Sequence, residues 1–392
     1  MKILYFSPHP NLYLQIPSGP GVHMREMMLA FETLGHEVKP LIMGGTDAQL
    51  TTSGSSPNQT SLKERIKWFI PKVLWASAKD INLNKFDLHA KSELLKAIKE
   101  FEPDVIYERT NYAMVSGVEA AKEMNIPHIL EMNAPYPEEK AGMEGKGLFH
   151  HKSIQKEMDQ LTKTNLVVVV SSALENYVKK RVPNQQVVIT PNAIRSNLTP
   201  PDQNVKLRQK FGISTQALVF GFVGSIFPYH GVDRLIEAFA KLKIEQAHLV
   251  IVGDGYVLDE LKSLSTQLNI TDKVTFTGSV PHSEIYSHIG AMDITIMAKS
   301  NWYGSPVKIF EYGAMNKAII APNVIPVQDV MIHEQDGLLV EPTVTSISDA
   351  MNTLANDPEL RLRLAASFHA KVKSQHTWTH MAELILQRLT SN

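Results

Sequence analysis

The chain has 392 residues, of which 43% are hydrophobic and 20% are charged, and its formal net charge is −1. This length exceeds what a single hydrophobic core normally supports, and the near-zero charge gives no general attraction to nucleic acid. The sequence contains no cysteine, which excludes disulfides, thiolate metal sites and cysteine nucleophiles and fits a reducing compartment. No apolar run approaches the roughly 18–20 residues that a membrane-spanning helix needs, so we expect a cytoplasmic protein whose membrane contact, if any, is peripheral.

Short apolar strands alternate with amphipathic helical segments, a pattern typical of parallel α/β sheets. In the first half of the chain the predicted strands are residues 3–6, 37–42, 104–107, 128–131, 166–170 and 187–190. After the prolines at 191, 200 and 201, the predicted strands are residues 218–223, 248–252, 273–277, 293–297 and 318–321. We predict an α/β protein of two Rossmann-like, doubly wound domains, residues 1–195 and 196–377, facing a central cleft. A last helix, residues 378–392, is expected to pack back on the first domain.

Residues 61–79 interleave basic and aromatic side chains, as in Lys67-Trp68-Phe69. A helix of this kind can rest on an anionic membrane surface. Alternatively, its apolar side chains pack onto the first domain, a reading that Pro71 favours because proline interrupts the amphipathic pattern.

Polar residues follow two predicted strands of the first half, with Arg109 after one and Glu131 and Asn133 at the end of the next. The carboxyl ends of parallel strands meet at one edge of a sheet, where ligands bind in folds of this class. These side chains either form a binding surface or are polar groups that the protein itself satisfies.

Three predicted strands of the second half end in glycine, at Gly224-Ser225, Gly253-Asp254 and Gly278-Ser279-Val280. His230-Gly231 opens the helix that follows the first of these strands. Glycine lets a ligand approach the backbone closely, so three such turns at one sheet edge indicate a nucleotide site.

Residues 304–311, Gly-Ser-Pro-Val-Lys-Ile-Phe-Glu, form a turn that opens an apolar helix. The free N–H groups of a helix start can bind a diphosphate. Lys308 lies in the first turn, where a cation opposes the helix dipole, and a bound anion would relieve that misfit. Glu311 lies about one turn further on, placed to accept hydrogen bonds from ribose hydroxyls. The alternative is a buried helix start in which this lysine and glutamate are incidental.

With these motifs the sequence resembles the retaining glycosyltransferases of the GT-B fold, family 4 (group 1 glycosyltransferases). The resemblance covers essentially the whole chain and is most specific over residues 219–341. The family carries a Glu-x7-Glu motif whose second Glu holds the donor ribose, and Glu311 matches it, whereas Tyr303 stands where the first Glu is expected. Ser225 and His230 replace the Arg and Lys of the usual phosphate loop. The resemblance therefore implies a divergent subgroup, in which Lys308 and His230 restore positive charge.

The resemblance also implies that the first domain, residues 1–195, binds the acceptor and that the second, residues 196–377, binds the nucleotide sugar donor. In the family the glycine loop at residues 17–23 faces the donor phosphates and the acceptor. Arg109 stands where relatives often present a histidine. We list the expected site by role: Glu311, Lys308 and His230 as catalytic; Gly21, Gly224, Ser225, Gly253, Asp254, Val280, Tyr303, Gly304, Ser305 and Val307 as donor-binding; Arg109, Glu131 and Asn133 as acceptor-binding.

The expected reaction is transfer of a sugar from a nucleoside diphosphate sugar, with retention at the anomeric carbon, to a glycan or lipid-linked acceptor in polysaccharide or lipopolysaccharide assembly. No metal or other cofactor is expected, because the sequence has no Asp-x-Asp triplet and His150-His151 lacks a carboxylate at ligand spacing. Three alternatives stay open: a nucleotide-sugar epimerase of the same fold, a phosphorylase that uses a sugar phosphate, and a non-catalytic nucleotide-binding module.

Overall fold

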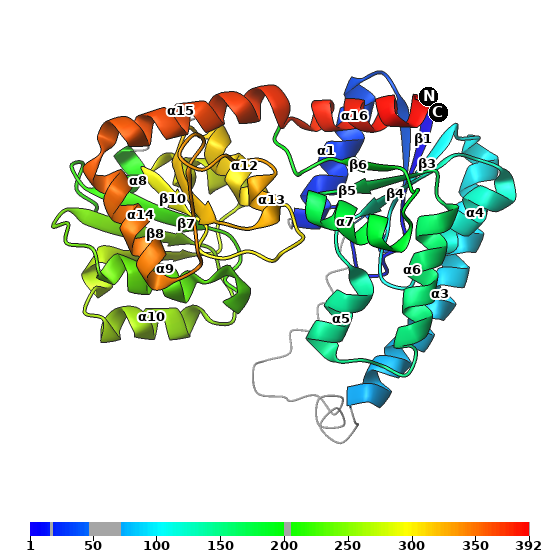
Figure 1. Cartoon of the computed structure of the whole chain (residues 1–392), viewed down its shortest axis with the longest axis horizontal. Coiled ribbons are helices and arrows are strands. Elements are labelled where there is room, and N and C mark those ends of the chain that lie inside the picture. Colours follow the sequence, from blue (N-terminus) through cyan, green and yellow to red (C-terminus); the bar gives the residue numbers. More distant parts are fainter. Residues whose placement is uncertain (16–18, 47–71, 200–204, 392) are drawn as a thin grey trace. The chain divides into compact units, whose positions relative to one another are not determined.

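The computed structural model describes residues 1–15, 19–46, 72–199 and 205–391 (Figure 1). The chain divides into two compact units, Met1–Thr190 with Ala382–Asn392, and Pro191–Met381. Each unit contains one six-stranded parallel sheet with helices packed against it. The predicted fold class, two doubly wound α/β domains, is confirmed. No helix in the described ranges is both long and apolar enough to span a membrane.

The sheet of the first unit has the strand order β2-β1-β3-β4-β5-β6. Its strands are β1 (Lys2–Ser7), β2 (Glu37–Ile42), β3 (Val105–Arg109), β4 (His128–Met132), β5 (Leu166–Val169) and β6 (Val187–Ile189). Its helices are α1 (Gly19–Thr33), α3 (Lys72–Phe101), α4 (Ser116–Met124), α5 (Tyr136–Glu144), α6 (His150–Lys163), α7 (Ser172–Arg181) and, from Ala382 onward, α16 (Trp378–Thr390). Strands β3, β4 and β5 are buried at every position, as expected of central strands covered on both faces.

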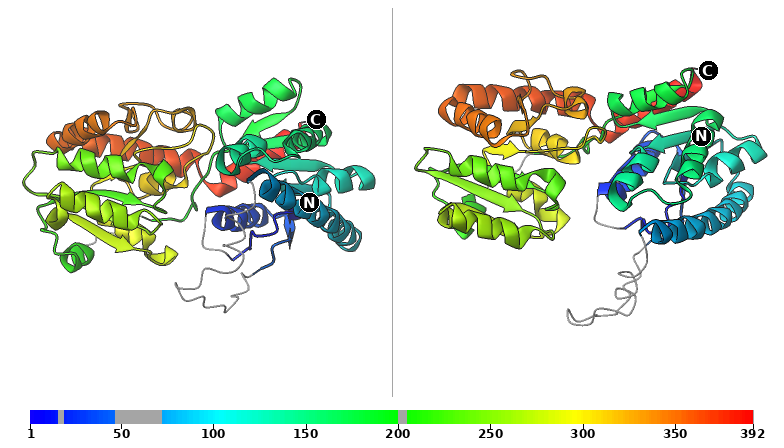
Figure 2. Two further views of the ribbon diagram at one scale, coloured as in Figure 1. Left: turned by 90° about the horizontal axis from the view of Figure 1, so that it is seen from below. Right: turned by 60° about the horizontal axis from the view of Figure 1, so that its bottom comes forward.

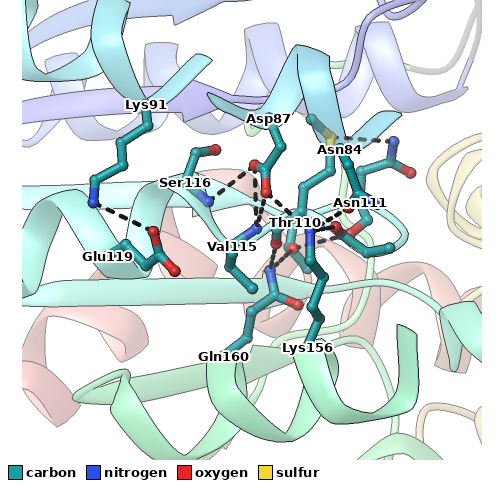
Figure 3. Close-up of polar contacts among 12 residues, drawn as sticks. Asn84, Asp87, Lys91, Thr110, Asn111, Val115, Ser116, Glu119, Lys156 and Gln160 are labelled. Carbon is teal, nitrogen blue, oxygen red and sulfur yellow. Dashed lines mark hydrogen bonds and ion pairs between the residues drawn. The ribbon is translucent and has the colours of Figure 1, made fainter. Parts of the chain in front are cut away.

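A polar network joins α3, α4 and α6 beside the end of β3 (Figure 3). The Asp87 carboxylate of α3 accepts hydrogen bonds of 2.9 and 3.0 Å from two backbone N–H groups where α4 begins, which satisfies donors that the helix itself leaves unpaired. Lys156 of α6 donates to Asn84 of α3 at 2.7 Å, and Gln160 of α6 donates to Thr110 at 2.6 Å. Because Thr110 directly follows β3, the network fixes the strand end from which Arg109 projects.

The sheet of the second unit has the strand order β12-β11-β10-β7-β8-β9. Its strands are β7 (Leu218–Val223), β8 (Ala247–Val252), β9 (Val274–Gly278), β10 (Ile294–Ile296), β11 (Ala318–Pro322) and β12 (Leu338–Val340). The helices are α8 (Val205–Lys210), η1 (Pro228–His230), α9 (Val232–Ala240), α10 (Leu258–Gln267), η2 (Thr271–Lys273), η3 (His282–Glu284), α11 (Ile285–Gly290), α12 (Val307–Ala314), α13 (Ile325–Gln328), α14 (Val344–Asn356) and α15 (Pro358–Gln375). The sequence analysis did not predict β12.

Helices cover both faces of this sheet (Figure 2). Alternation along β7 distributes side chains between two cores on the opposite faces. Phe220 and Phe222 belong to the core that contains α9 and α14, whereas Val219 and Val223 belong to the core that contains α12 and α15. With both faces covered, the carboxyl ends of the strands remain as the edge where loops and helix starts converge.

Candidate functional site

The turn that opens α12 is held by two asparagines that the sequence analysis did not single out. Asn301 Oδ1 accepts a hydrogen bond of 2.6 Å from the N–H of Gly304. Asn192 Nδ2 donates to the Ser305 carbonyl at 2.6 Å, and the Asn192 N–H donates to the Ser305 hydroxyl at 3.0 Å. The helix then begins at Val307, so the predicted turn and helix start are present and fixed in shape. Asn192 follows the first proline of the connection between the two halves, a place that offered no signal for this role.

Lys308 carries an ammonium group that is shielded from solvent and has no hydrogen-bond partner among the described residues. Its Nζ lies 4.4 Å from the centre of the Phe222 ring and 3.0 Å from where a Cβ on Gly224 would stand. Gly224 has φ +143°, so its backbone conformation favours glycine, and a side chain there would crowd the ammonium of Lys308. The strand-end glycine and the helix-start lysine thus meet at one point of the sheet edge.

Glu311 lies one turn after Lys308 and is partly buried. Burial lowers the pKa of Lys308 to about 7 and raises the pKa of Glu311 to about 7, and the opposite charge of each partly offsets the effect of burial on the other. Neither group is fully ionised near neutral pH, so a bound anion that returns Lys308 to its charged form would be favoured at this point.

His230 is neutral in this arrangement. Its Nδ1 lies 2.6 Å from the carbonyl oxygen of Ser225, an acceptor that places the proton on Nδ1 and leaves Nε2 without one. Burial, and then the charge of Lys308, lower the pKa of His230 to about 4. The second cation expected from the sequence is therefore absent in the unliganded protein, and a positive charge on His230 would require a nearby anion.

Some of the remaining predicted donor residues belong to the same unit as Lys308 and Gly224, and one belongs to the first unit. The Gly253 N–H donates to the Gly278 carbonyl at 3.0 Å, and the Asp254 side chain is exposed. Val280 packs against the core that contains α12, and the Tyr303 ring lies 5.3 Å from that of Trp302. Gly21 is a buried residue of α1 and belongs to the first unit. Residues 17 and 18 of the same predicted loop lie outside the described residues.

The predicted acceptor residues of the first unit form a network around a buried carboxylate. Glu131 is 1% exposed; it accepts hydrogen bonds from Tyr107 at 2.8 Å and Asn133 at 2.5 Å, and it pairs with Arg109 and, at 3.1 Å, with His23 Nε2. Burial raises the pKa of Glu131, but the charges of His23 and Arg109 outweigh burial and hold the pKa well below its usual value. Glu131 thus orients its neighbours and presents no surface of its own, while acceptor contacts by Arg109 and Asn133 stay a prediction.

The sequence did not lead us to predict Tyr107 or His23 as part of this network. Of the two, only Tyr107 could have been inferred from a sequence pattern. Arg109 and Glu131 are register partners on neighbouring parallel strands, so their side chains lie on the same face of the sheet. Tyr107 precedes Arg109 by two positions and shares that face by the period of a strand. His23 comes from α1, and nothing in its local sequence points to the end of β4.

The described part of residues 61–79 is helical and carries apolar side chains into solvent. Residues 61–71 lie outside the described residues, and α3 begins at Lys72. Val73, Leu74 and Trp75 are exposed, whereas the next residue, Ala76, is buried. The membrane interpretation and the packing interpretation of this segment both stay predictions.

We compared the structure with solved structures, which indicates its fold class, and the sequence with known families. The structure resembles that of Anabaena HepE crystallised with UDP, with a TM-score of 0.74 and 18% identity over 100% of both chains. It also resembles WaaG, a glycosyltransferase involved in lipopolysaccharide biosynthesis, with a TM-score of 0.67 and 15% identity over 100% of both chains. At such identities the likeness concerns the fold, which is the two-domain GT-B architecture.

Two family descriptions match the sequence, "Glycosyl transferases group 1" over residues 203–368 and "Glycosyltransferase Family 4" over residues 17–198. The chain belongs to the group 1, family 4 glycosyltransferases. It is 31% identical to the alpha-D-kanosaminyltransferase of Streptomyces kanamyceticus over 42% of each chain. It is 25% identical to the alpha-monoglucosyldiacylglycerol synthase of Streptococcus pneumoniae over 74% of this chain and 65% of that one. The chain thus spans about half the length of several of the curated relatives it matches.

Proposed function

We propose that the chain is a retaining glycosyltransferase that moves a sugar from a nucleoside diphosphate sugar to a glycan or lipid-linked acceptor, in polysaccharide or lipopolysaccharide assembly. The observation that carries the proposal is the shielded, partnerless ammonium of Lys308 beside Gly224 at the start of α12. A cation and free helix-end N–H groups at one point suit a diphosphate. The relatives support the pathway, since one is a lipopolysaccharide core glycosyltransferase, LpsD of Rhizobium meliloti, 26% identical over 73% of this chain.

In the proposed reaction the bond from the anomeric carbon to the diphosphate breaks as the acceptor oxygen attacks the same face. The departing phosphate takes the acceptor proton, so the protein needs to stabilise negative charge more than it needs a strong base. Lys308 and the N–H groups at the start of α12 supply that stabilisation, and losing one such group typically costs about 3 kcal/mol of barrier, or roughly a hundredfold in rate. Glu311 accepts hydrogen bonds from the ribose. Because these groups hold the diphosphate, we propose that neither a metal nor another cofactor is required.

The remaining parts of the proposal concern where the acceptor comes from. We propose that Arg109 of the first unit, which pairs with Glu131 at the end of β3, contacts the acceptor. The exposed apolar start of α3 would rest on the inner face of a membrane and bring a cytoplasmic enzyme to a lipid-linked acceptor. Binding to vesicles of anionic lipid, lost when Leu74 and Trp75 are changed to Ser, would support this location.

Ligand-dependent thermal stability tests the donor site directly. The protein is heated with UDP, GDP or ADP and with their sugars, and we expect one base to raise Tm, because a ligand at 100 times its Kd stabilises by about 2.7 kcal/mol. Lys308→Ala should abolish the shift and lower turnover roughly a hundredfold, whereas Lys262→Ala, at a lysine whose side chain is 51% exposed, should change neither. Equal small effects of the two substitutions would end the proposal.

Two further readouts separate the alternatives. An epimerase would convert the nucleotide sugar without any acceptor, and a binding module would show the thermal shift but no transfer. Transfer in the presence of EDTA at an unchanged rate would support independence from a metal.

A further inference from the structure

Three aromatic residues lie close together on two loops of the second unit. The proposed reaction assigns no role to these three side chains. Phe227 and Tyr229 lie between β7 and α9, and Tyr256 lies between β8 and α10. The ring of Phe227 stacks on that of Tyr229 with centroids 5.4 Å apart and an interplanar angle of 12°, and its centroid is 5.8 Å from that of Tyr256. Tyr229 is 53% exposed and Tyr256 is 72% exposed. We call Phe227, Tyr229 and Tyr256 the aromatic platform.

The two loops that carry the platform are joined backbone to backbone. The Ile226 N–H donates to the Asp254 carbonyl at 2.8 Å, one residue before Phe227. A Cβ on Gly255 would stand 2.0 Å from the Ile226 carbonyl oxygen, so only glycine allows the loops to approach this closely. Since β7 and β8 are neighbouring strands, the platform is held by the sheet itself and is formed before any ligand arrives.

The platform is continuous with the site of the partnerless ammonium. The Tyr229 ring lies 4.4 Å from that of His230, and the His230 ring lies 5.8 Å from that of Phe222. The Phe222 ring in turn is 4.4 Å from Lys308 Nζ. Ring contacts therefore link the exposed phenols to the group that we propose holds the diphosphate; because Phe222 is fully buried, this link runs through the interior of the unit.

We propose that the aromatic platform binds a pyranose ring of the acceptor glycan, an inference that rests on the proposed function. A pyranose has one face of C–H groups and a rim of hydroxyls, and a tyrosine offers a flat apolar ring with a polar tip. Asp254, next to this surface in the chain, is exposed; its Oδ1 accepts from the Gly255 N–H at 2.7 Å, which leaves Oδ2 for a sugar hydroxyl.

The chemistry of the platform favours a neutral sugar over an anionic group. Its three rings carry no charge, the adjacent Asp254 is acidic, and the pKa of His230 is lowered to about 4 by burial and by Lys308, so that ring is neutral. None of the platform's own side chains would offer a cation to a phosphate. The one other flat ligand of the reaction is the base of the donor nucleotide, which also stacks on aromatic side chains, and the experiment separates the two.

Saturation-transfer NMR on the full chain tests the platform with methyl α-D-glucopyranoside, mannopyranoside and galactopyranoside, each measured with and without UDP. We expect the ring C–H protons of at least one pyranoside to receive saturation. The signal should fall at least fivefold in the double variant Tyr229→Ala/Tyr256→Ala. It should persist in Tyr229→Phe/Tyr256→Phe, which keeps the rings, and in Trp75→Ala, which removes an exposed ring of the first unit.

The thermal shift given by UDP, GDP or ADP is measured on the same variants, which also shows that they are folded. The proposal is supported if the Tyr229→Ala/Tyr256→Ala variant loses the pyranoside signal but keeps the nucleotide thermal shift. The proposal is overturned if no pyranoside gives a signal with the native chain, or if the signal survives in the double Ala variant. It is also overturned if the double Ala variant loses the nucleotide thermal shift instead of the pyranoside signal, since the rings would then stack on the base. If no nucleotide raises the Tm of the native chain, the proposed donor site is contradicted. The pyranoside measurement would still test the aromatic platform.

Discussion

The two units of the molecule each bury an ionisable group at the carboxyl edge of a sheet, and they treat it in opposite ways. Glu131 of the first unit has partners on every side, namely Tyr107, Asn133, Arg109 and His23. Lys308 of the second unit has no hydrogen-bond partner among the described residues, and its Nζ lies over the face of the Phe222 ring, 4.4 Å from the ring centre. A buried polar group without a partner costs stability that a fully paired network does not.

This difference indicates what each site is built to do. The paired carboxylate of Glu131 fixes the positions of Arg109 and Asn133 before any ligand is present. The hydrogen bonds and ion pairs of this sheet end therefore already stabilise the folded protein. In the proposed function the ammonium of Lys308 gains a hydrogen-bond partner when the diphosphate binds, so the stability lost in the free protein would return as affinity. We expect substitutions to separate the two cases by the sign of their effect on stability.

Removing the paired carboxylate should have the largest effect. Glu131→Ala leaves Arg109 buried without its partner, and breaking a buried pair in this way typically destabilises by about 3–5 kcal/mol. Urea denaturation would measure the loss. Glu131→Gln, which keeps an acceptor for Tyr107 but removes the charge, should cost less, and Glu32→Ala, at an exposed position of α1, should cost about 0.5 kcal/mol or less. Equal losses for Glu131→Ala and Glu32→Ala would remove the distinction between the two units.

Removing the unpaired ammonium should instead stabilise the protein at mildly acidic pH. In the folded protein the pKa of Lys308 is depressed to about 7, so between pH 7 and the value of an ordinary lysine the unfolded chain holds the extra proton, and native stability rises with pH. At pH 5.5 the charged group is an unpaired cost that Lys308→Met removes, and Glu311 is then protonated because its pKa is raised to about 7. The expected gain is about 1–3 kcal/mol.

The same substitution should gain less at pH 9, because Lys308 of the native chain, with a pKa of about 7, is then neutral and its burial costs less. Thermal unfolding at pH 5.5 and pH 9 measures this fall in the gain, and the nucleotide thermal shift should be absent at both. A variant that is less stable than the native chain at pH 5.5 would show that Lys308 is paired in the free protein.

The sequence was sufficient to predict the fold, because strands of a sheet covered on both faces are apolar throughout and are separated by glycine and proline. It missed β12, since Leu338–Val340 is too short to stand out from its surroundings. It placed Glu311, Lys308 and Gly224 in one site from the turn chemistry alone, and the structure brings Lys308 and Gly224 together. Whether these residues bind the donor remains a prediction.

Contacts between distant segments escaped the sequence analysis for a physical reason. The neutrality of His230 follows from its burial and from the charge of Lys308, which lies in a different loop. Likewise, the lowered pKa of Glu131 depends on His23, which comes from a helix more than a hundred residues earlier. Local patterns predict where a side chain starts, whereas its state of ionisation depends on neighbours that only the fold assembles.

A third buried ionisable group, the carboxylate of Glu157 in α6, extends the comparison because its hydrogen-bonding capacity is only partly satisfied. The Tyr177 hydroxyl lies 2.6 Å from Glu157 and 2.5 Å from Glu138, and its single proton can serve one of them at a time. Burial, and then the charge of Glu138, raise the pKa of Glu157 to about 7, against the opposing effects of Tyr177 and Arg181. Between the ordinary pKa of a glutamate and about 7, the folded protein keeps a proton that the unfolded chain has released, so stability falls as pH rises.

Glu157→Gln should remove this dependence, so that the native chain loses about 1–2 kcal/mol relative to the variant between pH 4.5 and pH 7.5. Urea denaturation at the two pH values measures the difference, with Glu32→Gln as the matched control at an exposed glutamate. Parallel pH profiles for the native chain and Glu157→Gln would show that Glu157 is ionised throughout and is satisfied as fully as Glu131.

The smallest effect tests how much redundancy the Glu131 network has. Tyr107→Phe removes one donor, a hydrogen bond of 2.8 Å, and leaves Arg109, Asn133 and His23 around the carboxylate. With those donors still present the carboxylate is not orphaned, so the cost should be about 1 kcal/mol, the usual net worth of a single hydrogen bond. A loss as large as that of Glu131→Ala, measured by urea denaturation, would mean that the phenol is an essential member of the network, because a group with partners to spare tolerates the loss of one.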